Sequence, residues 1–185
     1  MKTPRRAILF VAAVLGTLLG TPGTAHASDG CLTCHQALGD KPATLFRRDV
    51  HHLRGITCAG CHGGDASVND MEKAMNPGVG FTGVPSGDSI SVRCAACHAD
   101  GEKMRQLHST LPTNQYSGLQ GSAHGKLSTT GKEMIAQCTT CYGAHGIVAV
   151  KDPASPVYPL NVVATCASCH RNATLIRSYN PNLPV

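Results

Sequence analysis

The chain has 185 residues, with 16 Lys and Arg against 11 Asp and Glu, 10 His, 10 Cys and no Trp. Aromatic residues make up 4% of it, and 20 Gly and 11 Pro argue against long regular helices or sheets. Ten Cys exclude an ordinary cytosolic enzyme, in which thiols are few and reduced. The chain therefore needs a further source of stability, such as disulfides, metal ions or a bulky cofactor.

Residues 1–27 are predicted to be a signal peptide. A basic stretch with Lys2, Arg5 and Arg6 precedes the apolar run 7–20, and the Ala-His-Ala of residues 25–27 has the form of a cleavage site. The apolar run is short for a bilayer span, and an uncleaved membrane anchor is the alternative. The mature chain, residues 28–185, keeps all 11 acidic residues but loses three of the 16 basic ones. Because little basic excess remains, no nucleic-acid partner is predicted.

The mature chain is expected to be mainly irregular with short α-helices. Helices are predicted over residues 91–107, 114–127 and 161–179. Residues 63–88 are rich in Gly and Pro and are predicted to form a loop. In addition, residues 94–113 resemble residues 166–185 at a constant offset of 72, which predicts an internal repeat within one domain over residues 28–185.

Every cysteine belongs to a Cys-x-x-Cys pair, and we number these five motifs in chain order. The pairs are Cys31 with Cys34, Cys58 with Cys61, Cys94 with Cys97, Cys138 with Cys141, and Cys166 with Cys169. In four motifs His follows at once, namely His35, His62, His98 and His170, whereas the fourth motif has Tyr142. This pattern is the signature of haem c attachment. The two thiols form thioethers with one haem, and the adjacent His binds the iron from the proximal side.

Two other uses of cysteine pairs fit less well. Zinc ribbons need pairs of pairs, and they do not need a His directly after the second Cys. Disulfides within a Cys-x-x-Cys pair close very small loops and stabilise little. Haem also accounts for the composition, because four or five porphyrins would supply the apolar interior that the missing aromatic residues do not. Four haems are predicted from the motifs, and a fifth at Cys138 and Cys141 is left open.

The sixth iron ligands are sought among the His outside the motifs, which are His51, His52, His108, His124 and His145. Five haems with two ligands each would use nine His and Tyr142. His108 ranks lowest, because the repeat places Asn180 at its position. Met75 is a rival ligand, since His/Met ligation raises the haem potential, although Met is also a common filler of apolar gaps.

Three further stretches resemble the exported multihaem cytochromes c of the cytochrome-c3-like, doubled-motif type. They are Asp49-Val50-His51, Ser122-Ala-His124-Gly125, and Gly143-Ala-His145-Gly146 after the fourth motif. The resemblance implies closely packed, low-spin haems with two His ligands each, and distal roles for His51, His124 and His145. It implies a periplasmic respiratory role with redox protein partners, among them a membrane quinol-oxidising complex or a terminal reductase. Self-association is left open.

The predicted function is electron transfer without catalysis. Iron with two axial ligands has no free position for a substrate, while closely spaced haems pass electrons along the chain. The alternative is a redox enzyme of the nitrogen- or sulfur-oxyanion type with an open iron at Tyr142. A structural or sensor subunit that only holds haems is a third interpretation.

Overall fold

The computed structural model of the chain describes residues 29–128 and 133–182. The predicted signal peptide lies outside the described residues. Within them the secondary structure is helical, and the one β feature is an isolated bridge between Leu127 and Met134. The helices are α1 (Gly30–Ala37), α2 (Lys41–Phe46), α3 (Cys58–His62), α4 (Met71–Ala74), α5 (Asp88–His98), α6 (Gly101–Gln106), α7 (Gln115–Gly121), α8 (Cys138–Tyr142), α9 (Val162–His170) and α10 (Ala173–Tyr179), with 3₁₀ turns η1 (His52–Arg54) and η2 (Pro77–Val79). The predicted fold class, irregular with short α-helices, is confirmed.

Two of the predicted helices are each divided in two. The helix predicted over 91–107 is α5 followed by α6, and the one predicted over 161–179 is α9 followed by α10. In both places a polar side chain caps the second helix. Asp100 accepts hydrogen bonds from the backbone of Glu102 and Lys103, and Asn172 accepts one from Leu175. Such N-caps satisfy backbone donors at a helix start and so favour a new helix over a continued one.

The loop predicted over 63–88 was wrong in part, because it contains α4 and η2. The side chain of Asp70 caps α4 by accepting from the Lys73 amide, and Asn76 accepts from the Gly78 amide in η2. Local capping thus orders two short turns within a stretch that Gly and Pro otherwise keep irregular. The helix predicted over 114–127 is shorter, ending at Gly121.

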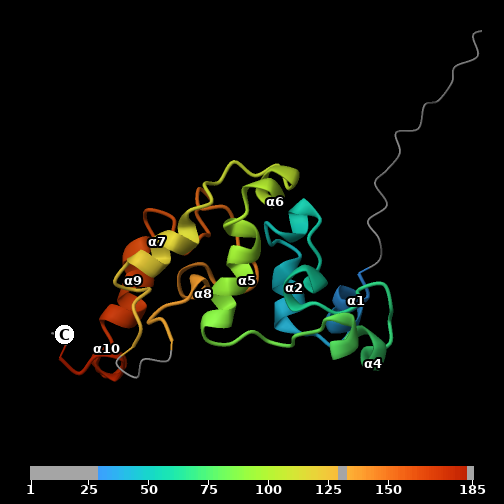
Figure 1. Cartoon of the computed structure of the whole chain (residues 1–185), viewed down its shortest axis with the longest axis horizontal. Helices are drawn as coiled ribbons and strands as arrows, with labels where there is room; N and C mark the ends of the chain where they lie inside the picture. Colours follow the sequence, from blue (N-terminus) through green and yellow to red (C-terminus); the bar gives the residue numbers. More distant parts are fainter. Residues whose placement is uncertain (1–28, 129–132, 183–185) are drawn as a thin grey trace, which may run out of the picture.

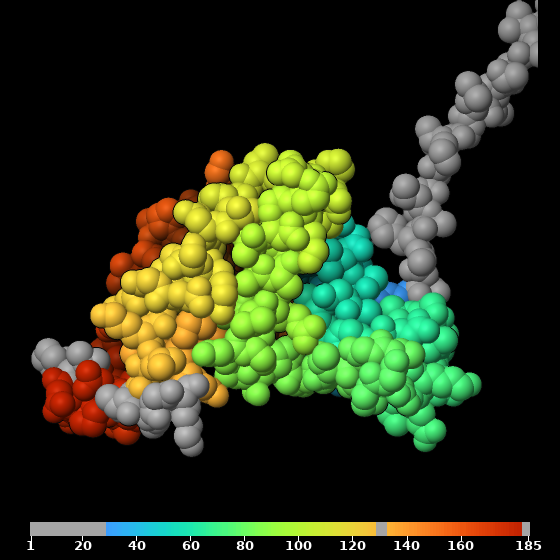
Figure 2. Space-filling view, viewed as in Figure 1, coloured from blue at the N-terminus to red at the C-terminus, as the bar shows by residue number. Residues whose placement is uncertain are grey.

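The molecule is elongated, and α5 lies at its centre (Figure 1). α5 contacts α6, α7 and α8; α1 contacts α2 and α3; and α9 contacts α10. The helices α1, α2 and α4 lie toward one end, and α7, α9 and α10 lie toward the other (Figure 1). In the space-filling view the residues of α5 likewise separate the N-terminal from the C-terminal parts of the chain (Figure 2). None of the helices in the described ranges is long and apolar enough to cross a bilayer.

The hydrophobic core is small. Its buried apolar side chains in the described ranges are Ala43, Phe46, Ala74, Met104, Met134 and Ala136. Three of these are alanine and one is aromatic, so the apolar area they remove from water is modest. Other apolar side chains near the motifs, such as Val92 and Val163, are more than half exposed. A chain of this size with so little core needs a further stabilising element, as its composition predicts.

Candidate functional site

All five motifs lie in helices. α1 contains the first motif, α3 and α8 are formed by the second and fourth, and the third and fifth end α5 and α9. Side chains three apart share one face of a helix, so both cysteines of a motif point to the same side. Each helix can therefore offer two thiols to one haem, with residue 35, 62, 98, 142 or 170 directly after them.

The ten cysteines predicted to bind haem are not joined in disulfides, and they differ in exposure. The exposed ones are Cys34, Cys61, Cys141 and Cys166. The half-buried ones are Cys31, Cys58, Cys94, Cys97, Cys138 and Cys169. Every motif thus has at least one half-buried thiol, and in the third motif both are half-buried.

The second cysteines of the first, third and fifth motifs lie near the end of a helical segment. The carbonyl oxygens of Cys34, Cys97 and Cys169 each accept a hydrogen bond from a backbone amide that follows the motif, at 3.1, 2.8 and 2.8 Å. At Cys169 the Ser168 hydroxyl also lies 3.9 Å from the sulfur. Haem attachment at these three residues, as at the other cysteines, stays a prediction.

Three of the four His that directly follow a motif, and are predicted as proximal ligands, face a second imidazole from a distant part of the chain. His98 faces His51, His62 faces His145, and His170 faces His124. In all three pairs the ring centroids are 6.0 Å apart. The rings of His62 and His145 are nearly parallel at 10°, whereas the other two pairs are close to perpendicular at 84° and 86°.

This separation fits an iron atom between the rings. A metal–imidazole bond of about 2 Å, with about 1 Å more from the nitrogen to the ring centre, places two axial rings about 6 Å apart across one metal. The residues present therefore fit haem c with two His ligands at the second, third and fifth motifs.

Hydrogen bonds orient the His62 ring. Its Nδ1 donates to the carbonyl oxygen of Gly83 at 2.9 Å, which leaves Nε2 free to bind a metal. The next residue, Gly63, has φ of 69°, and a Cβ there would lie 1.9 Å from the Gly80 carbonyl oxygen. Only glycine allows the chain to turn so closely after this motif.

The His124 loop is built by Ser122 and Gly125. The Ser122 hydroxyl donates to the Leu119 carbonyl at the end of α7 and accepts from the Gly125 amide. A Cβ on Gly125 would lie 1.9 Å from the same Leu119 oxygen. The Ser-x-His-Gly sequence thus closes a tight turn that directs His124 toward His170, in the C-terminal part of the chain.

The His51 ring is held by a buried carboxylate. Asp49 Oδ1 accepts from His51 Nδ1 at 2.8 Å and from the His51 amide at 2.9 Å. Its Oδ2 accepts from the Ile147 amide at 2.8 Å, two residues after His145. Burial alone would raise the pKa of Asp49, but these hydrogen bonds lower it below its usual value. Asp49 therefore links the segments that carry His51 and His145.

Burial also favours the metal-binding form of the imidazoles. It lowers the pKa of His98, with a further contribution from the nearby His51. Burial and the neighbouring His62 lower the pKa of His145, against an opposite effect of Asp49. A neutral imidazole has a free lone pair for a metal, so both rings are biased toward the state that ligates iron.

The first motif has a proximal hydrogen bond but no facing imidazole in the described ring contacts. His35 Nδ1 lies 2.5 Å from Asp40 Oδ2. His52 instead contacts the Phe46 ring, with centroids 5.1 Å apart. His108 has φ of 53°, and its carbonyl accepts from Arg54. His52 and His108 as iron ligands stay predictions.

Met75 lies on the turn after α4, and 38% of it is exposed. His145, rather than Met75, faces the proximal His62 of the second motif. Met75 as an iron ligand also stays a prediction.

The fourth motif is hydrogen-bonded to α5, although it has Tyr142 in place of the His that follows the other motifs. The fully buried Ser91 accepts from the Cys138 amide at 3.0 Å and donates to Gln137 Oε1 at 2.6 Å. A hydrogen bond from Cys94 lowers the pKa of the Cys138 thiol, which favours its reactive thiolate. Tyr142 ends α8 with 41% of it exposed. The motif thus keeps the helical geometry of the others.

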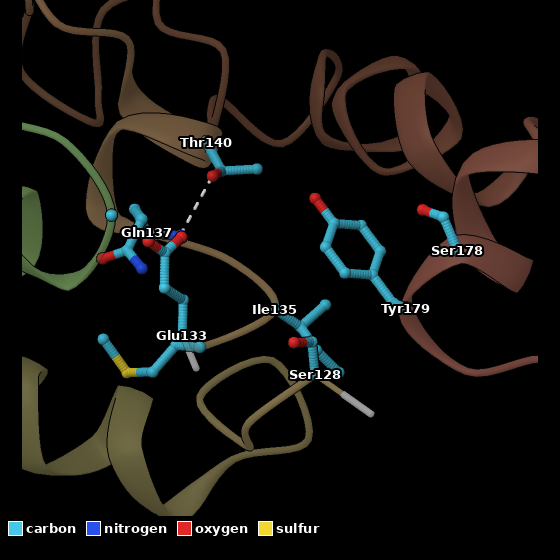
Figure 3. A pocket seen from close by; sticks show the side chains of 9 residues that line it. Ser128, Glu133, Ile135, Gln137, Thr140, Ser178 and Tyr179 are labelled. Atoms are coloured by element: carbon cyan, nitrogen blue, oxygen red, sulfur yellow. Dashed lines mark hydrogen bonds between the residues drawn. The ribbon is translucent and has the colours of Figure 1, made fainter. Parts of the chain in front are cut away.

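A cavity of about 490 Å³ lies beside the fourth motif (Figure 3). Tyr179 of α10 points its ring into it, opposite Gln137 and Thr140 (Figure 3). Its lining is mostly polar: Gly87, Ser128, Glu133, Met134, Ile135, Gln137, Thr140, Ser178 and Tyr179. These lining residues include neither Cys nor His, so the cavity does not contain the axial positions of an iron. In the described ranges no group of three or more His, Cys, Asp or Glu gathers around a point that could hold a bare metal ion.

Comparison with curated proteins finds a polyhaem relative. It is the C-type polyhaem cytochrome OmcC of Geobacter sulfurreducens, to which the chain is similar, with 30% identity over 196 aligned positions. The similarity covers 89% of this chain but 24% of that protein, so the chain spans about a quarter of its relative. No family model and no solved structure matches the chain.

The polyhaem relative supports the multihaem part of the resemblance found in the sequence. The cytochrome-c3-like subtype stays a prediction. Sequence reasoning singled out His51, His124 and His145, but it did not pair them with particular motifs. It also did not assign roles to Asp40, Asp49 and Gly83, which hold imidazoles in place. The position of Asp49 two residues before His51 is a signal that could have drawn attention to it.

Proposed function

We propose that the chain is an electron-transfer protein that carries four or five covalently attached haems c, most of them with two His ligands. The observation that carries this proposal is the set of three imidazole pairs, each joining a proximal His to a distal one at 6.0 Å. The similarity to a polyhaem cytochrome supports it independently.

Each group of residues has a distinct task in this proposal. Haem iron, when bound, supplies a one-electron couple between its ferric and ferrous states. The cysteine pairs would hold the macrocycles, and the paired imidazoles would hold the iron from both sides, which would leave no position for a substrate. Gly83 and Asp49 orient the rings of His62 and His51 through Nδ1. Fixed ligands limit rearrangement on electron transfer, which suits a carrier.

In this proposal, the pairing also links the haem sites of the second and third motifs. His145 follows the fourth motif and faces the second, while His51 precedes the second motif and faces the third. Two neighbouring ligand pairs are therefore tied to each other through the Asp49 and Ile147 hydrogen bond. Sites linked in this way favour electron transfer from one to the next over catalysis at an isolated iron.

Cellular location and partners belong to the same proposal. We place the mature protein in the periplasm, because thioether attachment of haem follows export of the unfolded chain. Its partners would be redox proteins, with a membrane quinol-oxidising complex or a terminal reductase as donor or acceptor. The enzymatic alternative depends on Tyr142, and no contact described for this residue favours it.

The test is the intact mass of protein matured in a periplasm, together with its electronic spectrum. We expect the mass of four or five haems on the processed chain and low-spin ferric iron at the three paired sites. A protein without covalently bound haem would reject the proposal. A haem-loaded protein whose iron is largely high-spin would favour the enzymatic alternative.

A further inference from the structure

Asp49 is the one charged side chain that is buried in the described ranges, with 1% of it exposed. Burying a carboxylate is costly unless several donors satisfy it. The side chain that contacts this carboxylate is the His51 ring, which donates through Nδ1, and no Lys or Arg in those ranges pairs with it. Because burial of this charge is costly, we ask what its hydrogen bonds do for the residues around it.

The two oxygens of Asp49 serve two different ligand segments. Oδ1 accepts from the ring and the amide of His51, and Oδ2 accepts from the amide of Ile147. The Val50 amide donates in turn to the Ile147 carbonyl at 2.7 Å. One carboxylate thus fixes His51 and, through Ile147, the short loop that carries His145.

The hydrogen bond to His51 also has an electronic consequence. A carboxylate that accepts from Nδ1 draws the proton toward itself and makes the opposite ring nitrogen a stronger donor to a metal. Stronger donation and a nearby negative charge both stabilise ferric over ferrous iron. By contrast, the Nδ1 of His62 donates to the neutral carbonyl of Gly83, and hydrogen bonds to charged acceptors are about twice as strong as neutral ones.

We propose that Asp49 is a positioning residue shared by two haem sites, which holds the distal ligands of the second and third motifs and lowers the reduction potential of the iron between His51 and His98. The inference rests on the haem ligation proposed above. The electron enters the iron alone, and no covalent bond forms or breaks. The carboxylate resists reduction of this iron because the added electron lies near a fixed negative charge.

The test is Asp49→Asn in the haem-loaded protein, followed by a potentiometric titration. The amide keeps an oxygen acceptor for His51 but removes the charge and turns one position into a donor. We expect the equilibrium of the His51/His98 iron to shift about tenfold toward the ferrous form, which is a rise of about 59 mV.

The affected iron can be assigned by electron paramagnetic resonance. Perpendicular rings donate to different iron d orbitals and leave them nearly equal in energy, which gives a strongly anisotropic signal. The signal that disappears in His51→Ala belongs to the His51/His98 iron. The nearly parallel rings of His62 and His145 should give a less anisotropic, rhombic signal, whose potential we expect to change less in Asp49→Asn.

Asp100→Asn is the matched control. Asp100 lies two residues after His98 and caps α6, and Asn is an equally good N-cap. It accepts from backbone amides and pairs with Lys103, not with an imidazole. Its replacement removes one charge close in sequence to His98 but should leave the potential near that of wild type, because solvent screens this exposed carboxylate. Asp40→Asn should raise the potential of the first-motif iron, less strongly because Asp40 is partly exposed.

The outcomes separate this inference from the proposed function. Absence of haem from the wild-type protein would overturn both. Haem-loaded Asp49→Asn with unchanged potentials, or with a shift equal to that of Asp100→Asn, would overturn the role of Asp49 alone. If Asp49→Asn does not assemble, redox-difference infrared spectra test the role of Asp49 instead. They are recorded on the Asp40→Asn protein, in which the carboxylate that contacts His35 is absent. A carboxylate band that shifts with ¹³C-aspartate and titrates with the His51/His98 iron is expected, and its absence would overturn the inference.

Discussion

Single residues decide which imidazoles face each other. His124 and His108 both lie outside the motifs, but their surroundings in the structure differ. His124 faces His170 with ring centroids 6.0 Å apart, whereas His108 follows α6 in a left-handed conformation held by Arg54. Composition alone does not distinguish these two residues; their surroundings do.

Replacement of His124 tests this distinction. In His124→Ala we expect one iron to lose its sixth ligand, which produces a high-spin ferric signal and carbon monoxide binding after reduction. The measurements are the electronic and paramagnetic resonance spectra of the haem-loaded variant. His108→Ala is made for comparison, and wild-type spectra in that variant would remove His108, the lowest-ranked candidate, from the predicted ligands. A fully low-spin His124→Ala protein would contradict the pairing with His170.

A second prediction at this scale concerns Gly125. A methyl group at this position would meet the Leu119 carbonyl, so Gly125→Ala must displace the His124 loop. We expect a loss of about 1–3 kcal/mol in stability, as for overpacked sites, and a high-spin fraction at the fifth motif. Thermal unfolding and the ferric spectrum measure the two effects.

Gly118→Ala is the control for Gly125→Ala. Gly118 lies within α7, and a Cβ there meets no atom within 4 Å. Because Ala favours a helix over Gly by about 1 kcal/mol, this variant should be equal to or more stable than wild type. A destabilised Gly118→Ala protein with an unaffected Gly125→Ala protein would contradict the steric argument.

At the scale of elements, the chain repeats one arrangement at the third and fifth motifs. Both α5 and α9 end in the His of a motif, and a short capped helix, α6 or α10, follows each. The caps Asp100 and Asn172 lie 72 residues apart, the same offset as the motifs. The fourth motif in α8 has the cysteines but neither a proximal His nor a directly following helix, so it is the irregular element.

Tyr142→His tests whether the fourth motif carries haem. Attachment normally depends on the His after the second Cys, so we expect the natural motif to be empty and the variant to gain one haem mass. Intact mass spectrometry measures this directly. An unchanged mass with a change from high to low spin would mean that haem is already bound beside Tyr142, and would direct attention to catalysis there.

At the scale of the whole molecule, little protein core holds the chain together. The buried apolar side chains in the described ranges are few, and Phe46 is the one aromatic ring among them. Ligand pairs such as His124 with His170 connect parts of the chain far apart in sequence. If iron joins these pairs, haem binding and folding are a single process, as in other folds that depend on a metal.

Loss of haem should therefore unfold much of the chain. In the double variant Cys94→Ser with Cys97→Ser we expect one haem fewer, and a clear loss of helical signal because α5 contacts three other helices. Circular dichroism and intact mass give the readout. Well-dispersed amide resonances from the haem-free chain would show that the protein folds without its cofactor and would contradict this prediction.

The cysteine spacing and the adjacent His determine the attachment chemistry locally, because both thiols and the proximal imidazole come from one helical turn. Because each motif occupies a helical turn, the sequence could also predict helices around the third and fifth motifs, at residues 91–107 and 161–179. It could not predict the caps that divide each of them in two. The sequence could not predict which His outside the motifs faces which motif His. His51 reaches the third motif and His145 the second through loops whose course depends on Asp49 and Ile147, 98 residues apart. Only the tertiary structure decides such contacts, since sequence spacing carries no information on which distant segments share a buried hydrogen bond.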